Sequence, residues 1–361
     1  MNKIEIFENV DNFFPNKEKR DSLGHQIISE AFVYQYENNE SYRKFCEAQG
    51  VTPKDVKEDL RKIPLLPSTL FKKYSIRTNT GSRTVRECYS SGTQGSLSTI
   101  ERDEVTLENF FKSVQTTITG VFKCTEYTVL NLGPSEEQAK NVWFAYVMSS
   151  IRNLLPTKNY IKDGVFLCSD LVNDIKELTT QNTKLIIIGA PMLFVELFDF
   201  MDKNNITLEL KEPITVTAGG WKKSMKKAVT KQIFNQMCIE HLKGLQEANI
   251  RDVFNMVELN TVLPECECGN KHIPVWLDIY AIDMKTYQAA EDGEIGLLGF
   301  VDSSAQSYPS FIMSGDLGRI SHVDNCPCGK SGKCVEIVRR INTIESRGCA
   351  LKIQGSVKEV Q

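Results

Sequence analysis

The spacing of apolar residues changes along this chain and predicts three kinds of structure. Residues 18–60 are polar, with aromatic side chains at intervals, as at Phe32 and Tyr36. This pattern indicates a set of helices. Pro64 and Pro67 then interrupt the chain, so we expect the helical segment to end before residue 70.

From about residue 127, short apolar runs alternate with stretches of helical spacing. The runs are 127–133, 164–168, 184–189, 214–220 and 253–258. Helical spacing follows at 192–201 and 224–242, with Ser224 as a candidate N-cap. Such alternation predicts an α/β fold, in which a parallel sheet is flanked by helices.

After residue 262 the pattern is mostly that of strands, at 272–282, 296–301 and 311–313, and predicts a smaller β-rich part. The expected organisation therefore has four parts. They are an N-terminal helical segment packed on the core (1–70), an α/β core (71–262), a β-rich subdomain (263–340) and a C-terminal arm (341–361).

A loop rich in hydroxyls and glycines is the most informative motif of the chain. Three hydroxyls and two glycines fall within six positions, in the order Ser90, Ser91, Gly92, Thr93, Gln94, Gly95. Hydroxyls and bare backbone N–H groups are suited to surround phosphate oxygens, and glycine lets the backbone approach closely. The same residues also make ordinary surface turns, so the motif alone leaves both interpretations open.

A second candidate site follows the run that ends near residue 218. Ligands of parallel α/β sheets bind beyond the carboxyl ends of the strands. Gly219 and Gly220 would let a flat ring lie against bare backbone there, and Trp221 would add a stacking face. The alternative is a strand-to-helix turn with a packing tryptophan.

Composition excludes several classes of protein. The chain has 361 residues, of which 41% are hydrophobic and 25% charged, with a net charge of −3. This is typical of a globular protein and gives no basic field for nucleic acid. No apolar run is long enough to span a bilayer, and the acidic N-terminus lacks the apolar core of a signal peptide. We therefore expect a cytoplasmic location, and we interpret the eleven cysteines as reduced thiols, metal ligands or a nucleophile, and not as a disulfide framework.

Two copies of Cys-X-Cys-Gly predict a metal site. Cys266 and Cys268 form one pair, and Cys326 and Cys328 form the other. Four thiolates in a tetrahedron suit structural Zn²⁺. His272 could replace one thiolate and Cys334 is a further candidate, so the choice of four ligands stays open. Reduced surface thiols are the alternative interpretation.

The order of these motifs resembles the adenylate-forming enzymes, and among them the acyl-protein synthetases of the LuxE type. Phenylacetate–CoA ligases are the neighbouring branch, and some of them have a zinc site that the paired cysteines resemble. The resemblance runs from about residue 60 to the end of the chain. It implies the N-terminal-domain fold of that superfamily without the mobile C-terminal lid domain, since thirteen residues follow Gly348.

The resemblance also implies a role for each motif. Residues 90–95 would hold the phosphates of ATP, residues 219–222 would lie beside adenine, and Asp316 would bind the ribose hydroxyls. Arg340 would open the hinge motif, and Cys349 would accept the acyl group. Glu258 would bind Mg²⁺, at the end of the segment that also contains Asn255, Met256 and Val257.

Departures from the family pattern limit what the resemblance implies. The lysine common near the phosphate loop is missing, and Leu97 and Ser98 stand there. Asn255 stands for the usual glycine and Val257 for the usual threonine, so one hydroxyl contact to phosphate is lost.

The expected function is ATP-dependent activation of a carboxylic acid, such as a fatty acid, as acyl-adenylate. Glu258 is suited to Mg²⁺ as a hard oxygen ligand, and the hydroxyls as phosphate donors. The acyl group would move to the thiol of Cys349 and on to a partner, such as a reductase. Two alternatives stay open. One is an acyl- or aryl-CoA ligase that uses free CoA, and the other is a zinc-stabilised binding protein without catalysis.

Overall fold

A computed structural model describes residues 3–90, 97–220 and 229–341. The chain divides into two compact units, of which the first comprises Met1–Val10 and Gly81–Gly269 and the second Asp11–Thr80 and Asn270–Gln361. Residues 11–80, which include most of the predicted N-terminal helical segment, share a unit with the β-rich C-terminal part.

The first unit is built on a twisted sheet in the order β12-β11-β9-β7-β4-β5-β6. The five inner strands are parallel, and β12 and β6 pair antiparallel at the edges. Their bounds are β4 (Tyr127–Pro134), β5 (Thr157–Lys162), β6 (Val165–Phe166), β7 (Lys184–Gly189), β9 (Ile214–Ala218), β11 (Ile250–Phe254) and β12 (Leu263–Pro264). A separate hairpin is made of β2 (Arg86–Tyr89) and β3 (Thr99–Arg102), and β8 (Leu208–Glu209) pairs with β10 (Leu242–Lys243).

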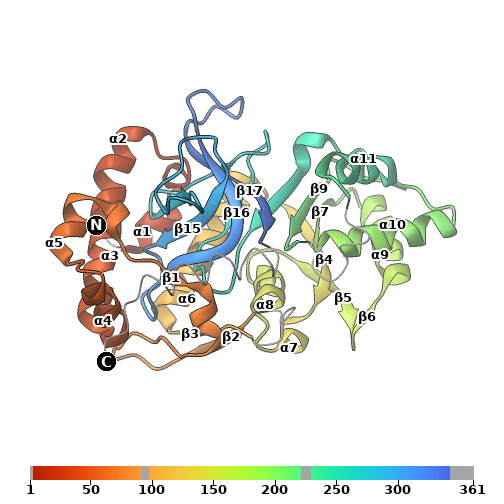
Figure 1. Ribbon diagram of the computed structural model, residues 1–361. Coiled ribbons are helices and arrows are strands. Elements are labelled where there is room, and N and C mark those ends of the chain that lie inside the picture. Colours follow the sequence, from red (N-terminus) through yellow and green to blue (C-terminus); the bar gives the residue numbers. More distant parts are fainter. Residues whose placement is uncertain (1–2, 91–96, 221–228, 342–361) are drawn as a thin grey trace. The chain divides into compact units, whose positions relative to one another are not determined.

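Helices cover this sheet, and Figure 1 shows α9, α10 and α11 beside β4, β7 and β9. Strand β7 is buried along nearly its whole length, as expected of a central parallel strand. The helices of the unit are α1 (Lys3–Glu8), α6 (Glu104–Thr116), α7 (Glu136–Ala139), α8 (Trp143–Ser150), α9 (Cys168–Thr180), α10 (Pro191–Lys203) and α11 (Lys231–His241). The fold class predicted from the alternation is therefore confirmed.

Local signals explain where these helices begin. Pro191 occupies the first turn of α10, where a missing N–H costs nothing. Thr230 caps α11 by accepting a hydrogen bond from the Ile233 amide. Ser224, the cap expected from the sequence, lies outside the described residues.

One strand prediction in this unit is wrong, and another is right in type but not in its bounds. The run 164–168 contributes only the short antiparallel β6, and the parallel neighbour of β4 is β5, which the apolar pattern did not reveal. Asp163 and Gly164 both have positive φ, so they form the tight turn of a β5–β6 hairpin. The run 253–258 leaves the sheet after Phe254, because the chain must turn there to pair β12 against β11.

The second unit contains a mostly antiparallel sheet in the order β13-β17-β16-β15-β14, with β1 added parallel to β16. Figure 1 shows β15, β16 and β17 side by side. The strands are β1 (Leu66–Pro67), β13 (Lys271–His272), β14 (Leu277–Ile282), β15 (Gly296–Asp302), β16 (Phe311–Val323) and β17 (Gly332–Arg340). The strand pattern expected after residue 262 is confirmed, although β16 is much longer than the run 311–313.

Helices α2 (Lys17–Lys19), α3 (His25–Asn38), α4 (Glu40–Ala48) and α5 (Pro53–Glu58) belong to the same unit. The buried side chain of Gln35 on α3 donates to the carbonyl oxygens of Ala305, Gln306 and Tyr308 at 3.0–3.3 Å. The connection between β15 and β16 thus depends on an amide from the N-terminal helices. These contacts, 270 residues apart in sequence, explain why 11–80 and 270–361 form one unit.

Across the ranges that the structure describes, no helix combines the length and the apolar character needed to cross a bilayer.

Candidate functional site

The hydroxyl-rich loop is carried by the β2–β3 hairpin of the first unit. Tyr89 and Thr99 are opposite each other at the end of the ladder. Beyond them, the amide of Ser90 donates to the carbonyl of Ser98, and the amide of Ser98 donates to Oγ of Ser90, both at 3.0 Å. Ser90 therefore closes the base of the loop. Ser91, Gly92, Thr93, Gln94 and Gly95 lie outside the described residues.

Two neighbouring parallel strands bring further site residues to one edge of the sheet. Ala218 of β9 is the register partner of Val253 of β11. Gly219 follows the first strand and Asn255 follows the second, so both leave the sheet at its carboxyl edge. Gly219 has φ of +74°, and a Cβ there would lie 3.3 Å from the ring of Phe144, which explains the glycine. Trp221 lies outside the described residues.

Residues 255–261 form a buried connection that carries Glu258. The side chain of Glu258 is only 6% exposed. Asn255 shapes the segment, because its Nδ2 donates to the carbonyls of Leu259 at 3.3 Å and Thr261 at 2.8 Å. Its Oδ1 accepts a hydrogen bond of 2.7 Å from the indole of Trp143. Asn255, which departs from the family pattern, thus makes contacts that a glycine could not make.

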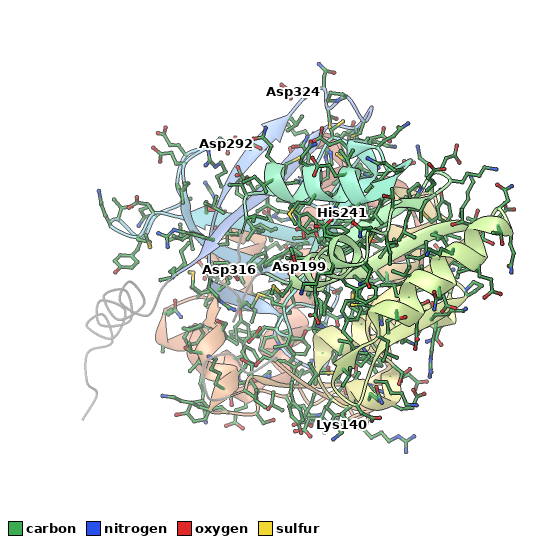
Figure 2. All side chains as sticks on the ribbon, turned by 90° about the vertical axis from the view of Figure 1, so that its right-hand side faces the viewer. Lys140, Asp199, His241, Asp292, Asp316 and Asp324 are labelled. Atoms are coloured by element: carbon green, nitrogen blue, oxygen red, sulfur yellow. The ribbon has the colours of Figure 1, made fainter. Side chains whose placement is uncertain are left out.

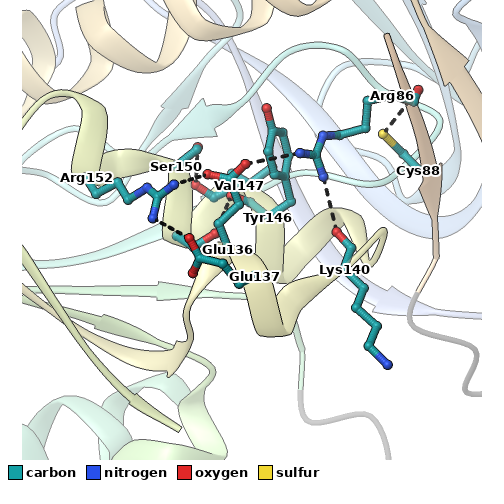
Figure 3. A network of polar contacts seen from close by, with 10 residues as sticks. Arg86, Cys88, Glu136, Glu137, Lys140, Tyr146, Val147, Ser150 and Arg152 are labelled. Atoms are coloured by element: carbon teal, nitrogen blue, oxygen red, sulfur yellow. Dashed lines mark hydrogen bonds and ion pairs between the residues drawn. The ribbon is translucent and has the colours of Figure 1, made fainter. Parts of the chain in front are cut away.

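Helix α8 supports this edge, and its position is fixed by the network in Figure 3. Arg86 of β2 stacks on the ring of Tyr146, with its guanidinium carbon 3.7 Å from the ring centroid, and pairs with Glu136 at 3.1 Å. Arg152 pairs with Glu136 at 3.0 Å and with Glu137 at 2.9 Å. The hairpin is therefore joined to α8 by the stacking of Arg86 on Tyr146 and to α7 by linked ion pairs through Glu136.

Arg102 is a residue of this region that the sequence analysis missed. It is fully buried on β3, and its guanidinium carbon lies 3.7 Å from the ring centroid of Trp143. The strand alternates, with Ile100 and Arg102 on the buried face. The sequence signal that could have revealed this is the two-residue alternation of the strand, which places Arg102 on the same face as the apolar Ile100.

Asp316 lies in the second unit, in the middle of β16 (Figure 2). Arg340 of β17 is its register partner, and the Nε of Arg340 lies 3.6 Å from a carboxylate oxygen of Asp316. Asp316 is 8% exposed. Burial raises the pKa of Asp316 above its ordinary value, and Arg340 opposes that shift. The strand pairing thus brings together two of the predicted site residues.

The two Cys-X-Cys-Gly segments form equivalent turns. Gly269 has φ of +76° and donates to the carbonyl of Cys266 at 2.9 Å, and Gly329 has φ of +78° and donates to Cys326 at 2.8 Å. Both first cysteines are buried. Each glycine adopts the left-handed conformation that a side chain disfavours, so both segments have the bend that thiolate ligation requires.

A cysteine and histidine cluster surrounds His272 in the second unit. The ligand atoms of His272, Cys326 and Cys328 lie within 4.8 Å of one another. Nε2 of His272 is 3.7 Å from Sγ of Cys328, and Nδ1 is 3.4 Å from Sγ of Cys334. Burial, with a contribution from Lys330, lowers the pKa of His272 to about 4. The imidazole is therefore neutral at neutral pH, which is its metal-binding form.

Cys266 and Cys268 belong to the last residues of the first unit, which ends at Gly269. Cys266 is buried, Cys268 is exposed, and the Cys268 amide donates to Sγ of Cys266 at 3.4 Å. A buried sulfur that accepts an amide hydrogen bond is better suited to ligation than the exposed one. Cys349 lies outside the described residues.

Comparisons with known proteins agree over nearly the whole chain. A family model described as acyl-protein synthetase, LuxE, matches residues 5–357. A long-chain-fatty-acid–luciferin-component ligase of Aliivibrio fischeri is 34% identical over 350 residues, which cover 96% of this chain and 91% of the relative. A ligase of the same description from Vibrio harveyi is 32% identical over 339 residues, covering 93% and 88%.

Solved structures show the fold. The open conformation of a 2-hydroxyisobutyryl-CoA ligase, in complex with 2-HIB-AMP and CoA, matches with a TM-score of 0.68 and 14% identity over 92% of this chain and 72% of that one. A long-chain-fatty-acid-CoA ligase from Archaeoglobus fulgidus matches with a TM-score of 0.51 and 12% identity, over 77% and 55%.

Proposed function

Because the chain belongs to the LuxE family of acyl-protein synthetases, we propose that it activates a long-chain fatty acid with ATP and transfers the acyl group to a cysteine thiol. The family consists of ligases of the adenylate-forming type. The relatives from Aliivibrio fischeri and Vibrio harveyi are described as ligases of long-chain fatty acids, which supports this substrate class. The acceptor that follows the cysteine would be a partner protein, such as a reductase.

One observation carries the proposal more than any other. The acidic side chain of Glu258 is held in a buried connection at the carboxyl edge of β9 and β11, where open α/β sheets bind their ligands. Glu258 offers the hard oxygen that Mg²⁺ prefers.

The proposed reaction has two chemical steps. A carboxylate oxygen of the acid attacks the α-phosphorus of ATP, and pyrophosphate leaves with the electron pair of the broken P–O bond. The thiolate of Cys349 then attacks the acyl carbon, and AMP leaves. Mg²⁺, when bound, neutralises charge that develops on the phosphates. Asp316 would orient the nucleotide by accepting its ribose hydroxyls.

A structural zinc is a second part of the proposal. The donors of His272, Cys326 and Cys328 are soft, clustered and largely buried, which fits Zn²⁺. The fourth ligand stays a prediction from the sequence, with Cys266 and Cys268 as candidates, of which Cys266 is buried and Cys268 exposed. Cys334 would then accept a hydrogen bond from Nδ1 of the histidine and fix its orientation.

Replacing Cys349 by serine tests the acyl transfer. After incubation with ATP, Mg²⁺ and a long-chain fatty acid, intact-mass measurement is expected to find an acyl adduct on the unaltered protein and none on Cys349→Ser. Cys168→Ser, a partly exposed cysteine at the start of α9, is the matched control and should keep the adduct.

Two other outcomes would contradict this transfer step. Turnover that requires free CoA, without any adduct, would identify an acyl-CoA ligase. An adduct that persists in Cys349→Ser would place the acceptor elsewhere in the chain.

Asp316→Asn separates nucleotide binding from stability. The amide cannot accept both ribose hydroxyls as a carboxylate does, so ATP affinity is expected to fall about 10-fold, the effect of about 1.4 kcal/mol. Stability should change in the opposite direction. Burial raises the folded-state pKa of Asp316, so its contribution to stability is present below the unfolded value and is lost as the pH rises through the folded value.

The variant should therefore melt at a higher temperature than the unaltered protein at pH 7, and the difference should shrink toward pH 4. Calorimetry and ATP titration measure the two effects. The control is Asp292→Asn, an exposed carboxylate of the same unit that pairs with His322 and is labelled in Figure 2. Equal ATP affinity for Asp316→Asn and Asp292→Asn would refute the ribose role.

A further inference from the structure

The side chain of Arg102 reaches the residues on either side of Glu258. Its Nη2 donates to the carbonyl of Val257 at 2.7 Å and to that of Leu259 at 3.4 Å. Its Nε donates to Oδ1 of Asn260 at 3.1 Å. The guanidinium therefore fixes the backbone immediately before and after the acidic residue.

Trp143 completes the same arrangement from α8. One face of its ring lies against Arg102, while its indole N–H donates to Asn255. Asn260, in turn, donates from Nδ2 to the carbonyl of Thr106 near the start of α6, at 2.8 Å. The segment that bears Glu258 is thus held at its beginning by Trp143 and at its middle by Arg102.

Physical costs explain why an arginine is placed there. A buried connection leaves carbonyl oxygens that need donors, and a buried guanidinium needs acceptors and a polarisable face to offset its desolvation. Nε and Nη2 of Arg102 supply donors to the side chain of Asn260 and to the carbonyls of Val257 and Leu259. The planar fork of arginine reaches acceptors in several directions at once, which a lysine cannot do.

Arg86 provides a natural comparison within the same hairpin. It is the direct cross-strand partner of Arg102, and it stacks on Tyr146 at the same 3.7 Å distance at which Arg102 stacks on Trp143. Its polar contacts, however, go to Glu136 and to the carbonyl of Lys140. The two arginines share strand pairing and aromatic stacking and differ in whether they hold the Glu258 segment.

Building on the function proposed above, we infer that Arg102 is a positioning residue for the divalent-metal ligand Glu258. It ties the strand that leaves the phosphate-loop hairpin to the 255–261 connection and holds the carboxylate in the orientation that Mg²⁺ binding requires. Partners outside the ligand shell of a metal typically change affinity about 10- to 100-fold.

Hydrogen exchange tests the structural half of this inference without assuming any activity. Arg102→Met is expected to speed amide exchange in peptides covering 255–261 by about tenfold or more, because the free energy of locally opening this segment becomes smaller. In Arg102→Lys the exchange rate of these peptides should lie between those of the unaltered protein and Arg102→Met, because lysine keeps the charge but lacks the planar guanidinium that reaches several acceptors. Arg86→Met should leave these peptides unchanged and affect 136–150 instead. Equal protection of 255–261 in all variants would overturn the inference.

The Mg²⁺ requirement tests the functional half. In acid-dependent ATP–pyrophosphate exchange, Arg102→Lys and Arg102→Met should need about 10- to 100-fold more Mg²⁺ for half-maximal rate. Arg86→Lys and Arg86→Met should keep the ordinary requirement. A lower maximal rate in the Arg102 variants with an unchanged Mg²⁺ requirement would mean a merely structural role and would refute the positioning role.

The two measurements distinguish failure of the proposed function from failure of the inference about Arg102. If the unaltered protein exchanges no pyrophosphate with any acid, the proposed function fails, and hydrogen exchange still decides whether Arg102 holds the segment. If the unaltered protein exchanges and the Arg102 variants match the Arg86 variants, only the inference about Arg102 fails.

Discussion

Glu258→Gln is expected to lower acid-dependent ATP–pyrophosphate exchange about 100- to 1000-fold, the typical effect of removing one group that stabilises transition-state charge. Glutamine keeps the volume of the buried side chain but has no charge to offer a divalent cation. The fold should survive, because the carbonyls that flank this position are held by Arg102. Filter or mass-spectrometric assays of pyrophosphate exchange, run at saturating Mg²⁺, measure the loss.

Glu265→Gln is the matched control for burial. Glu265 is also a buried acid near the end of the first unit, and it pairs with Lys231 at 2.7 Å. Its substitution should reduce stability by breaking that pair and leave exchange within a fewfold of normal. If Glu258→Gln keeps full exchange, or if the two variants lose it equally, Glu258 does not bind the metal.

Loss of the proposed zinc is expected to have the largest effect on stability. The purified protein should contain about one zinc per chain, and removal by a strong chelator should lower the melting temperature by about 10 °C or more, since structural zinc contributes several kcal/mol. The affinity of the protein for zinc should fall as the pH falls, because protons compete with the metal for the thiolates. Metal analysis together with calorimetry before and after chelation measures this.

Variants distinguish metal ligation from cysteine loss in general. Cys326→Ser and His272→Ala should lose zinc and stability together. Cys46→Ala removes a fully buried cysteine of the same unit, on α4, and should keep its zinc while losing some packing. Zinc-free protein with an unchanged melting temperature, or Cys326→Ser with full zinc, would contradict the site.

The sequence predicted those elements that depend on residues close together in the chain. The apolar run at 184–189 is β7, and the helix that follows it is α10. The equivalent Cys-X-Cys-Gly turns were also visible, because glycine spacing reports backbone conformation directly. The adenylate-forming fold, implied by the order of the motifs, agrees with the likeness to a solved 2-hydroxyisobutyryl-CoA ligase.

Long-range contacts were the part that the sequence could not reveal. The grouping of 11–80 with 270–361 depends on contacts such as those of Gln35 with the 305–308 carbonyls. The role of Arg102 depends on acceptors more than 150 residues away in the chain. Asn255 was noted only as a departure from a pattern, because its partner Trp143 comes from a different helix.

Isotope transfer tests the central claim, that this protein joins a carboxylic acid to the α-phosphate of ATP. A long-chain fatty acid labelled with ¹⁸O in both carboxylate oxygens is incubated with the protein, ATP, Mg²⁺ and a thiol acceptor, and the products are examined by mass spectrometry. Attack on the α-phosphorus predicts AMP that carries one ¹⁸O, because the bridging oxygen stays with the phosphate. Label in inorganic phosphate, or unlabelled AMP alongside acylated product, would contradict the account.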